Sequence, residues 1–362
     1  MVARGGAGAR WLGIAPACRD RIADAWGVVM IQVLRIGTRA SALALWQANR
    51  VAHLIRAQPG APRVELVHIR TEGDANTEIP LWQAGGRAFF TREIDRAQLA
   101  GEVDLAVHSL KDLSTALDPG LALAAVLERE DPRDALVTHA GASIAELPPA
   151  ARVGTSSLRR RAFLARARGD LRQLELRGNV PTRIERLGQG RYDAIVLAAA
   201  GLKRLGLARH IAGYLPPGEF PPAVSQGAIG VCIRAGDPNA RWIEPLDHFP
   251  TRVAVTAERA LLARIEGGCQ VPLGALAQLE GGRLRLQAVV CALDGSASLE
   301  LEEEIGLTLQ PPPGRAPGDG SAAAEALQQA SALGVRAADA LLARGAAALI
   351  ARLRTPAPVP PA

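Results

Sequence analysis

Three short apolar segments of this 362-residue chain each run into a turn of Gly, Ser, Thr or Asn, and arginine follows closely in every case. The turns span residues 37–41, 154–157 and 177–183. Alternating short strands and helices joined by such turns are typical of parallel, doubly wound sheets. In that architecture the turns lie at the carboxyl ends of strands, where helix N-termini attract anions. The sequence therefore predicts an α/β fold with an anion-binding crevice.

The arginines near these turns indicate the kind of anion. They are Arg39 at the first turn, Arg159 and Arg160 at the second, and Arg177 and Arg183 at the third. A forked guanidinium group binds a carboxylate through two hydrogen bonds, so we expect a small ligand that carries several carboxylates. The alternative is that these arginines only decorate the surface.

The stretch VDLAVHSLKD, residues 103–112, is the centre of the predicted site. A buried strand ends here in a histidine, a serine, a lysine and an aspartate, as expected where a strand meets a ligand crevice. Only two of the 42 basic residues are lysines, Lys111 and Lys203. A lysine beside Asp112 therefore indicates a specific role for this pair. We interpret Asp112 as the chemical centre. The alternative is that Asp112 caps a turn and Lys111 is solvated.

Composition favours a globular protein of the reducing cytoplasm. Apolar residues make up 48 % and charged residues 22 % of the chain, and no apolar run approaches the roughly 20 residues that cross a bilayer. The scattered histidines argue against a metal centre, and the cysteines lack the CxxC spacing of a zinc site. The four cysteines are Cys18, Cys232, Cys269 and Cys291.

The net charge of +6 and pI of about 9.7 raise the question of nucleic-acid binding. Aromatic residues are only 3 % of the chain, which leaves few side chains for stacking on bases. No block of basic residues resembles a binding arm. We therefore expect no nucleic-acid partner.

The pattern predicts three domains and an N-terminal extension. Because the apolar segment 221–233 follows the second unit, we expect it to cross back into the first sheet, which produces a two-hinge clamshell like that of periplasmic binding proteins. We interpret residues 1–29 as a misassigned start, with a disordered extension and then a transit peptide as alternatives. The predicted domains are 30–127 with 228–246, 128–227, and 247–362.

Individual elements follow from periodicity and turn signals. Strands are expected at residues 33–36, 64–69, 103–108, 121–126, 171–176 and 194–201. Helices are expected at 42–55 with Ser41 as N-cap, before residue 100, at 251–266 and at 323–353. Residues 128–135 are expected to form a hinge loop, 275–304 an antiparallel meander that makes the third domain α+β, and 310–322 an insertion without structure.

Seven motifs carry a resemblance to a known family. In chain order they are VHSLKD, EREDPRDA, VGTSSLRR, RGNVPTR, LAAAGLKRLG, PAVSQGA and EGGCQVP, within residues 34–272. The chain resembles the porphobilinogen deaminases, also called hydroxymethylbilane synthases. Beyond Pro272 the likeness lies in architecture more than in motifs.

The resemblance implies a dipyrromethane cofactor, assembled by the enzyme from its own substrate and bound by a thioether to Cys269. From the residues alone, a lone cysteine such as Cys269 is more often an inert small apolar side chain. The resemblance also implies that Asp112 is the catalytic carboxylate. It assigns Lys111, Ser157, Arg159, Arg160 and Arg183 to cofactor binding, and Arg39, Ser41, Thr155, Arg177 and Arg204 to substrate binding.

The implied activity is that of a transferase in haem and other tetrapyrrole biosynthesis, monomeric and cytoplasmic. Four porphobilinogen molecules lose ammonia and are joined head to tail, and hydroxymethylbilane is released. A buried carboxylate would stabilise the cationic pyrrole intermediate and manage protons. The alternative is a non-catalytic clamshell protein that binds a small polycarboxylate, which would need neither Cys269 nor Asp112.

The loop at residues 81–94 departs from the family pattern. Gln83 and Arg87 stand where lysines are common, and Ala88 replaces a glycine. Phe90 is expected to pack against pyrrole rings from the same active-site loop. The expected consequence is a change in loop closure and chain elongation.

Overall fold

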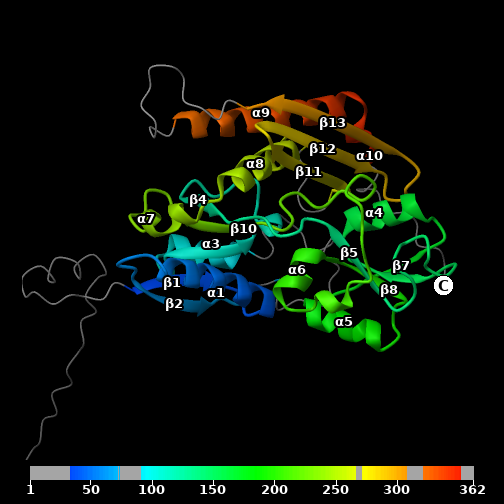
Figure 1. The fold of residues 1–362 in the computed structure, drawn as a ribbon, viewed down its shortest axis with the longest axis horizontal. Coiled ribbons are helices and arrows are strands. Elements are labelled where there is room, and N and C mark those ends of the chain that lie inside the picture. The colour runs from blue at the N-terminus through cyan, green and yellow to red at the C-terminus, as the bar shows by residue number, and fades with distance from the viewer. Residues whose placement is uncertain (1–32, 72, 74–90, 266–270, 308–320, 352–362) are drawn as a thin grey trace, which may run out of the picture.

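The computed structural model describes residues 33–71, 73, 91–265, 271–307 and 321–351, which form three sheets with helices packed on them (Figure 1). The strands are β1 Val33–Thr38, β2 Arg63–His68, β3 Leu105–Ser109, β4 Leu121–Val126, β5 Asp134–Thr138, β6 Arg152–Gly154, β7 Arg172–Leu174, β8 Ala194–Ala198, β9 Gly213–Tyr214, β10 Ile229–Arg234, β11 Leu273–Glu280, β12 Arg283–Cys291 and β13 Ser298–Gly306. The α-helices are α1 Ala42–Arg56, α3 Arg92–Leu99, α4 Leu158–Ala167, α5 Val180–Gly188, α6 Ala199–Arg204, α7 Ala240–Ile243, α8 Phe249–Arg264, α9 Ser321–Ala343 and α10 Ala346–Ala351.

The first sheet has the strand order β2-β1-β3-β10-β4. β1 pairs in parallel with β2 and β3, whereas β10 runs antiparallel to both β3 and β4. Apolar side chains of α1, such as Val51 and Ile55, pack on this sheet in a core that is shielded from solvent. The predicted return of the chain into the first sheet is confirmed, because β10 follows the second sheet in sequence.

The second sheet has the strand order β7-β6-β8-β5-β9 and repeats the plan of the first. β6 pairs in parallel with β7 and β8, and β5 runs antiparallel to β8. This antiparallel pairing places Asp134, the first residue of β5, opposite Ala198 at the carboxyl end of β8. The expected parallel, doubly wound arrangement holds for β1 with β2 and β3, and for β6 with β7 and β8. Both of these sheets also contain antiparallel pairings.

The third sheet is the expected antiparallel meander, β11-β12-β13, and α8 and α9 cover it. These two helices approach each other closely at Gly334 of α9. A Cβ atom at this position would lie 2.1 Å from the carbonyl oxygen of Ala257. A larger side chain would therefore separate the helices and open the core beneath them.

Several predicted boundaries are wrong. Residues 199–201 begin α6 rather than ending a strand, and the predicted strand 171–176 is only Arg172–Leu174. Asp134 already belongs to β5 rather than to the hinge loop, and the insertion at 310–322 overlaps the start of α9. The helix expected at 323–353 is interrupted at Gly345, whose φ of 96° is incompatible with a continuous right-handed helix.

Several predicted features lie outside the described residues. They are the extension 1–29, most of the loop 81–94 and Cys269. The loop residues Gln83, Arg87, Ala88 and Phe90 are among them. Along the described parts of the chain, none of the helices combines the length and the apolar character that crossing a bilayer demands.

Candidate active site

The first sheet brings two predicted site segments to one edge. Arg39 and Ser41 follow β1, and Lys111 and Asp112 form a short 3₁₀ turn after β3. Because β1 and β3 are parallel neighbours, both segments leave the sheet at its carboxyl edge. The predicted cap is confirmed, since the Ser41 side chain accepts a hydrogen bond from the backbone N–H of Ala44.

The second sheet arranges its site segments in the same way. Thr155 and Ser157 follow β6, and Arg177 follows its parallel neighbour β7. Ser157 is the N-cap of α4, and its Oγ accepts from the backbone N–H of Arg160 at 3.4 Å. Thr155 is buried and accepts from the backbone N–H of Ser157 at 3.2 Å. The short polar residues in this motif therefore begin the helix and place its arginines.

Arg159 and Arg160 converge on the carboxylate of Asp134. The Arg159 Nη2 and Arg160 Nη2 atoms lie 2.6 Å from Asp134 Oδ2 and Oδ1 respectively, and all three side chains are buried. Burial alone would raise the pKa of Asp134, but the two guanidinium charges outweigh it and hold this pKa below its usual range. We call Asp134, Arg159 and Arg160 the buried ion cluster.

Lys111 connects the first sheet to this cluster. Its Nζ donates to Gln226 Oε1 at 3.2 Å, and Gln226 Nε2 donates to Asp134 Oδ1 at 3.0 Å. Burial lowers the pKa of Lys111 to about 8, although the nearby Asp112 carboxylate opposes the shift. The lysine beside Asp112 is thus part of a network that spans both sheets.

Two further predicted arginines border the network. Burial and the positive charges of Arg160 and Arg177 lower the pKa of Arg183 to about 10, while Asp112 lies near enough to oppose this shift. Burial lowers the pKa of Arg204 to about 10. Both groups stay cationic at neutral pH, and Arg183 adds positive charge near Asp112.

Arg204 also links the two sheets. Its Nη2 donates to the carbonyl oxygen of Gly227 at 2.6 Å, and its guanidinium carbon lies 5.6 Å from the centre of the Trp46 ring. Trp46 lies on α1 and Arg204 on α6, which are neighbouring helices in Figure 1. A cation held over an aromatic face is stabilised by the ring quadrupole.

The donor set fits a ligand with many carboxylates. Lys111, Arg160 and Arg183 interact electrostatically with one another or with Asp112, and Arg39 lies near enough to His108 to lower the pKa of that imidazole. Guanidinium and ammonium groups bind carboxylates through charge-assisted hydrogen bonds. The predicted cations Arg39, Lys111, Arg160 and Arg183 therefore suit an anion that carries several carboxylates.

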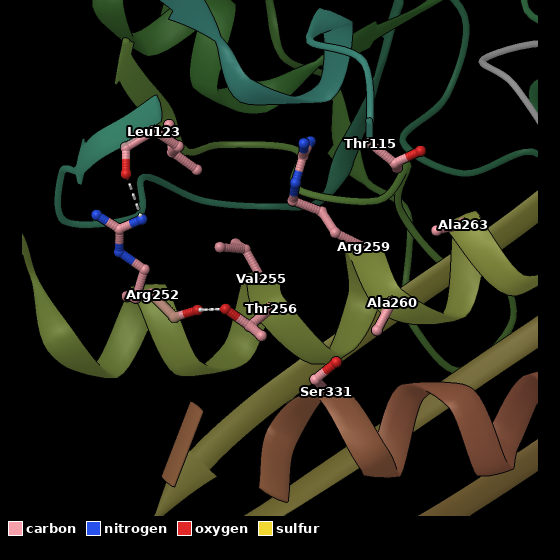
Figure 2. Close-up of a pocket in the computed structure, with 9 residues that line it drawn as sticks. All are labelled: Thr115, Leu123, Arg252, Val255, Thr256, Arg259, Ala260, Ala263 and Ser331. Carbon is pink, nitrogen blue, oxygen red and sulfur yellow. Dashed lines mark hydrogen bonds between the residues drawn. The ribbon is translucent and has the colours of Figure 1, made fainter. Parts of the chain in front are cut away.

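A pocket lies between α8, α9 and β4 (Figure 2), and none of its lining residues belongs to this network. Two arginines line it, and both bind backbone carbonyl groups. Arg252 donates to the carbonyl oxygens of Leu123 and Ala124 at 3.0 and 2.8 Å. Arg259 donates to the carbonyl oxygen of Ser114 at 2.5 Å. These arginines therefore hold the third sheet's helix against the first sheet, and Arg259 anchors the chain just after Asp112.

Comparison with known proteins identifies the family. The model of the porphobilinogen deaminase dipyrromethane cofactor binding domain matches residues 34–241, more than half of the chain, and the model of the porphobilinogen deaminase C-terminal domain matches residues 253–343. The chain belongs to the porphobilinogen deaminase family. The predicted family, its enzymatic activity and its dipyrromethane cofactor are thus confirmed.

Curated porphobilinogen deaminases cover most of this chain. The protein from Pelobacter propionicus is 51 % identical over 263 residues, which are 72 % of this chain and 84 % of that protein. The protein from Roseiflexus sp. is 52 % identical over 267 residues, covering 74 % and 88 %. Among solved structures, the methionine-binding protein MetQ covers 63 % of this chain and 93 % of its own, at a TM-score of 0.40 and 13 % identity.

Sequence reasoning missed the residues that join the porphobilinogen deaminase site together. Asp134 and Gln226 lie inside the motifs EREDPRDA and PAVSQGA, yet neither was assigned a role. Trp46 was also not singled out. The signal that could have found Asp134 is the pair of arginines in VGTSSLRR, since arginines buried side by side need a carboxylate.

Proposed function

We propose that this chain catalyses the head-to-tail joining of four porphobilinogen molecules, with loss of ammonia, and releases hydroxymethylbilane. The observation that carries the proposal is the convergence of Lys111, Asp112 and the buried ion cluster at the facing edges of two sheets in a member of this family. When bound, the dipyrromethane cofactor supplies the pyrrole end to which the first unit is joined. The alternative, a non-catalytic binding protein, is not favoured by the family match.

We assign Asp112 to the chemical step. Positive charge develops on a pyrrole when the amino group of porphobilinogen leaves, and an adjacent carboxylate stabilises this charge. The same carboxylate can accept hydrogen bonds from pyrrole N–H groups and hold or return a proton. Lys111 and Arg183 lie near enough to Asp112 to interact with it electrostatically.

We assign the surrounding cations to the carboxylates of cofactor and substrate. Lys111, Ser157, Arg159, Arg160 and Arg183 are proposed to hold the cofactor. Arg39, Ser41, Thr155, Arg177 and Arg204 are proposed to orient substrate and growing chain. All of these residues except Arg204, which ends α6, lie at strand ends and helix starts of the two sheets, which supports their assignment to carboxylate binding. Cys269 is proposed as the thioether anchor, with Arg87 and Phe90 on the active-site loop.

We further propose a monomer in the cytoplasm that binds neither nucleic acid nor membrane. The low aromatic content supports the absence of a nucleic-acid partner, and the scattered cysteines without CxxC spacing support the cytoplasm. The domain division stated above also remains a proposal, which the two mixed sheets and the separate antiparallel sheet support.

The test is the variant Asp112→Asn, with Asp118→Asn as the control. Asp118 is an exposed aspartate in the segment that follows the same strand, so it controls for the loss of one negative charge there. We expect the Asp112 variant to lose at least about 100-fold in turnover, as when one transition-state-stabilising group is removed. Unchanged thermal unfolding would show that it folds. Turnover close to that of the control would contradict the assignment.

A further inference from the structure

Gln226 lies in the segment that carries the chain from the second sheet back to the first. The backbone on either side of it is unusual, because Ser225 has a φ of 61° and Gly227 a φ of 90°. A Cβ atom at Gly227 would lie 2.2 Å from the carbonyl oxygen of Glu130, and the Ser225 N–H donates to Glu258 Oε2 at 2.6 Å. A non-glycine residue persists at positive φ where its surroundings fix it. The backbone that presents Gln226 is therefore held in one conformation.

The Gln226 side chain bridges the two sheets. Its Oε1 accepts from Lys111 Nζ at 3.2 Å. Its Nε2 donates to the carbonyl oxygen of Pro132 at 2.8 Å and to Asp134 Oδ1 at 3.0 Å. Lys111 follows β3 of the first sheet, whereas Asp134 begins β5 of the second. The side chain is only 1 % exposed, so water does not replace these contacts.

These partners allow only one orientation of the amide and only one residue type. An ammonium group can only donate, whereas the carbonyl oxygen of Pro132 and the carboxylate of Asp134 can only accept. A glutamate of the same shape would turn an oxygen toward two acceptors. A methionine of similar length would leave Lys111 without this acceptor and Asp134 without this donor.

The position of the Gln226 amide determines where the Lys111 ammonium group lies. Asp112 and Asp134 both attract the Lys111 ammonium group, and Gln226 Oε1 offers it a neutral acceptor instead. We propose that Gln226 is a positioning residue, which fixes the Lys111 ammonium group relative to the buried ion cluster and so holds both in place for the carboxylates of the cofactor. This inference rests on the proposed function, since it requires that Lys111 and the buried ion cluster bind the cofactor.

The experiment follows the assembly of the cofactor on the full-length protein. Protein produced without porphobilinogen is mixed with it, and the extra mass of two linked pyrroles is measured against time. Loss of hydrogen bonds to charged groups should slow loading of Gln226→Met by about tenfold or more. The control is Gln98→Met, because Gln98 is also a buried glutamine, fully shielded, whose amide donates to the Cys232 carbonyl oxygen at 2.7 Å outside the network. It should load at the wild-type rate.

The variant Gln226→Glu separates positioning from packing. It preserves the volume but needs a proton to donate toward Pro132 and Asp134. We expect its loading rate, relative to wild type, to fall as the pH rises from about 6 to 8, because ionised glutamate repels Asp134. A purely structural role would lower the unfolding temperature without adding this pH dependence. If Gln226→Met does not fold, the glutamate variant decides the question.

Wild-type loading in the folded Gln226 variants, with no added pH dependence, would overturn the inference. The variants Lys111→Met and Arg160→Met test the proposed function separately. If these two also load like wild type, the cofactor-binding assignment itself is wrong. If they load slowly while both Gln226 variants load normally, the assignment stands and only the role of Gln226 is wrong.

Discussion

The buried ion cluster beside the second sheet and the ion pairs on the third sheet have similar geometry in opposite surroundings. Arg159 and Arg160 lie 2.6 Å from Asp134, and their side chains are 4 % and 8 % exposed. On the third sheet, Arg285 lies 2.6 Å from Glu302, and these side chains are 57 % and 51 % exposed. The distance between the charged atoms therefore does not distinguish a site from an ordinary surface.

Burial explains the difference in what the pairs can do. Water screens an exposed pair, whose contribution to stability is small. A buried pair has lost its water, so removal of one partner leaves an uncompensated charge inside the protein. Arg159 and Arg160 are fixed in place by Asp134 and by the carbonyl oxygens of Pro221 and Val196. The buried ion cluster is therefore sensitive to the loss of a single charge, whereas the third-sheet pairs are not.

The largest effect is expected for Asp134→Ala, which leaves Arg159 and Arg160 buried without their carboxylate. Loss of one partner of a buried pair costs about 3–5 kcal/mol of unfolding free energy. Urea unfolding measures this change. The control is Glu304→Ala, which removes an exposed partner of Arg283 on the third sheet and should leave the unfolding curve nearly unchanged. Equal curves for the two variants would contradict the comparison.

A smaller, pH-dependent effect is expected at His108, a buried group with no hydrogen bond to Nε2 among the described residues. Burial lowers its pKa to about 4 from an ordinary value of 6.5, and Arg39 adds to the shift. As the pH falls, His108 therefore takes up its proton at a higher pH in the unfolded chain than in the folded protein. The stability that neutral His108 contributes is present above pH 6.5 and is lost toward pH 4, by roughly 3 kcal/mol in total.

The measurement for His108 is urea unfolding at pH 7 and pH 4.5, in wild type and His108→Gln. The wild type should lose more stability between the two pH values than the variant. Burial raises the pKa of Asp95 to about 6, which acts in the opposite direction, but this group is the same in both proteins and cancels in the difference. Equal losses in the two proteins would show that His108 does not titrate as described.

The smallest effect is expected for Arg285→Gln on the third sheet. Its ion pair with Glu302 is exposed, so salt and water already weaken it. We expect no measurable change in unfolding temperature or in turnover. A clear loss of stability would mean that the exposed pairs act as a network along β12 and β13.

Local features of the fold were predictable from the sequence. The cap at Ser41 depends only on the next three residues, so the local pattern was sufficient. The break at Gly345 is also local, but an Ala- and Leu-rich segment favours helix on both sides of it and hides the interruption. Strand ends were less predictable, because pairing with neighbouring strands determines them.

The contacts that assemble the site were not predictable in the same way. The bond from Gln226 to Asp134 joins residues 92 positions apart, and the bond from Lys111 to Gln226 joins residues 115 positions apart. Hydrophobic periodicity carries no information about such pairs. The motifs contain Lys111, Asp134 and Gln226, but only the folded structure shows that these residues meet.

The most direct test of the account is the intact mass of the purified protein beside that of a Cys269→Ser variant. The account predicts that the wild type carries the extra mass of two linked pyrroles and that the variant does not. Ehrlich's reagent should colour only the wild type. If neither protein carries the added mass, and incubation with porphobilinogen does not restore it, the cluster of arginines holds a different anion and the proposed function is wrong.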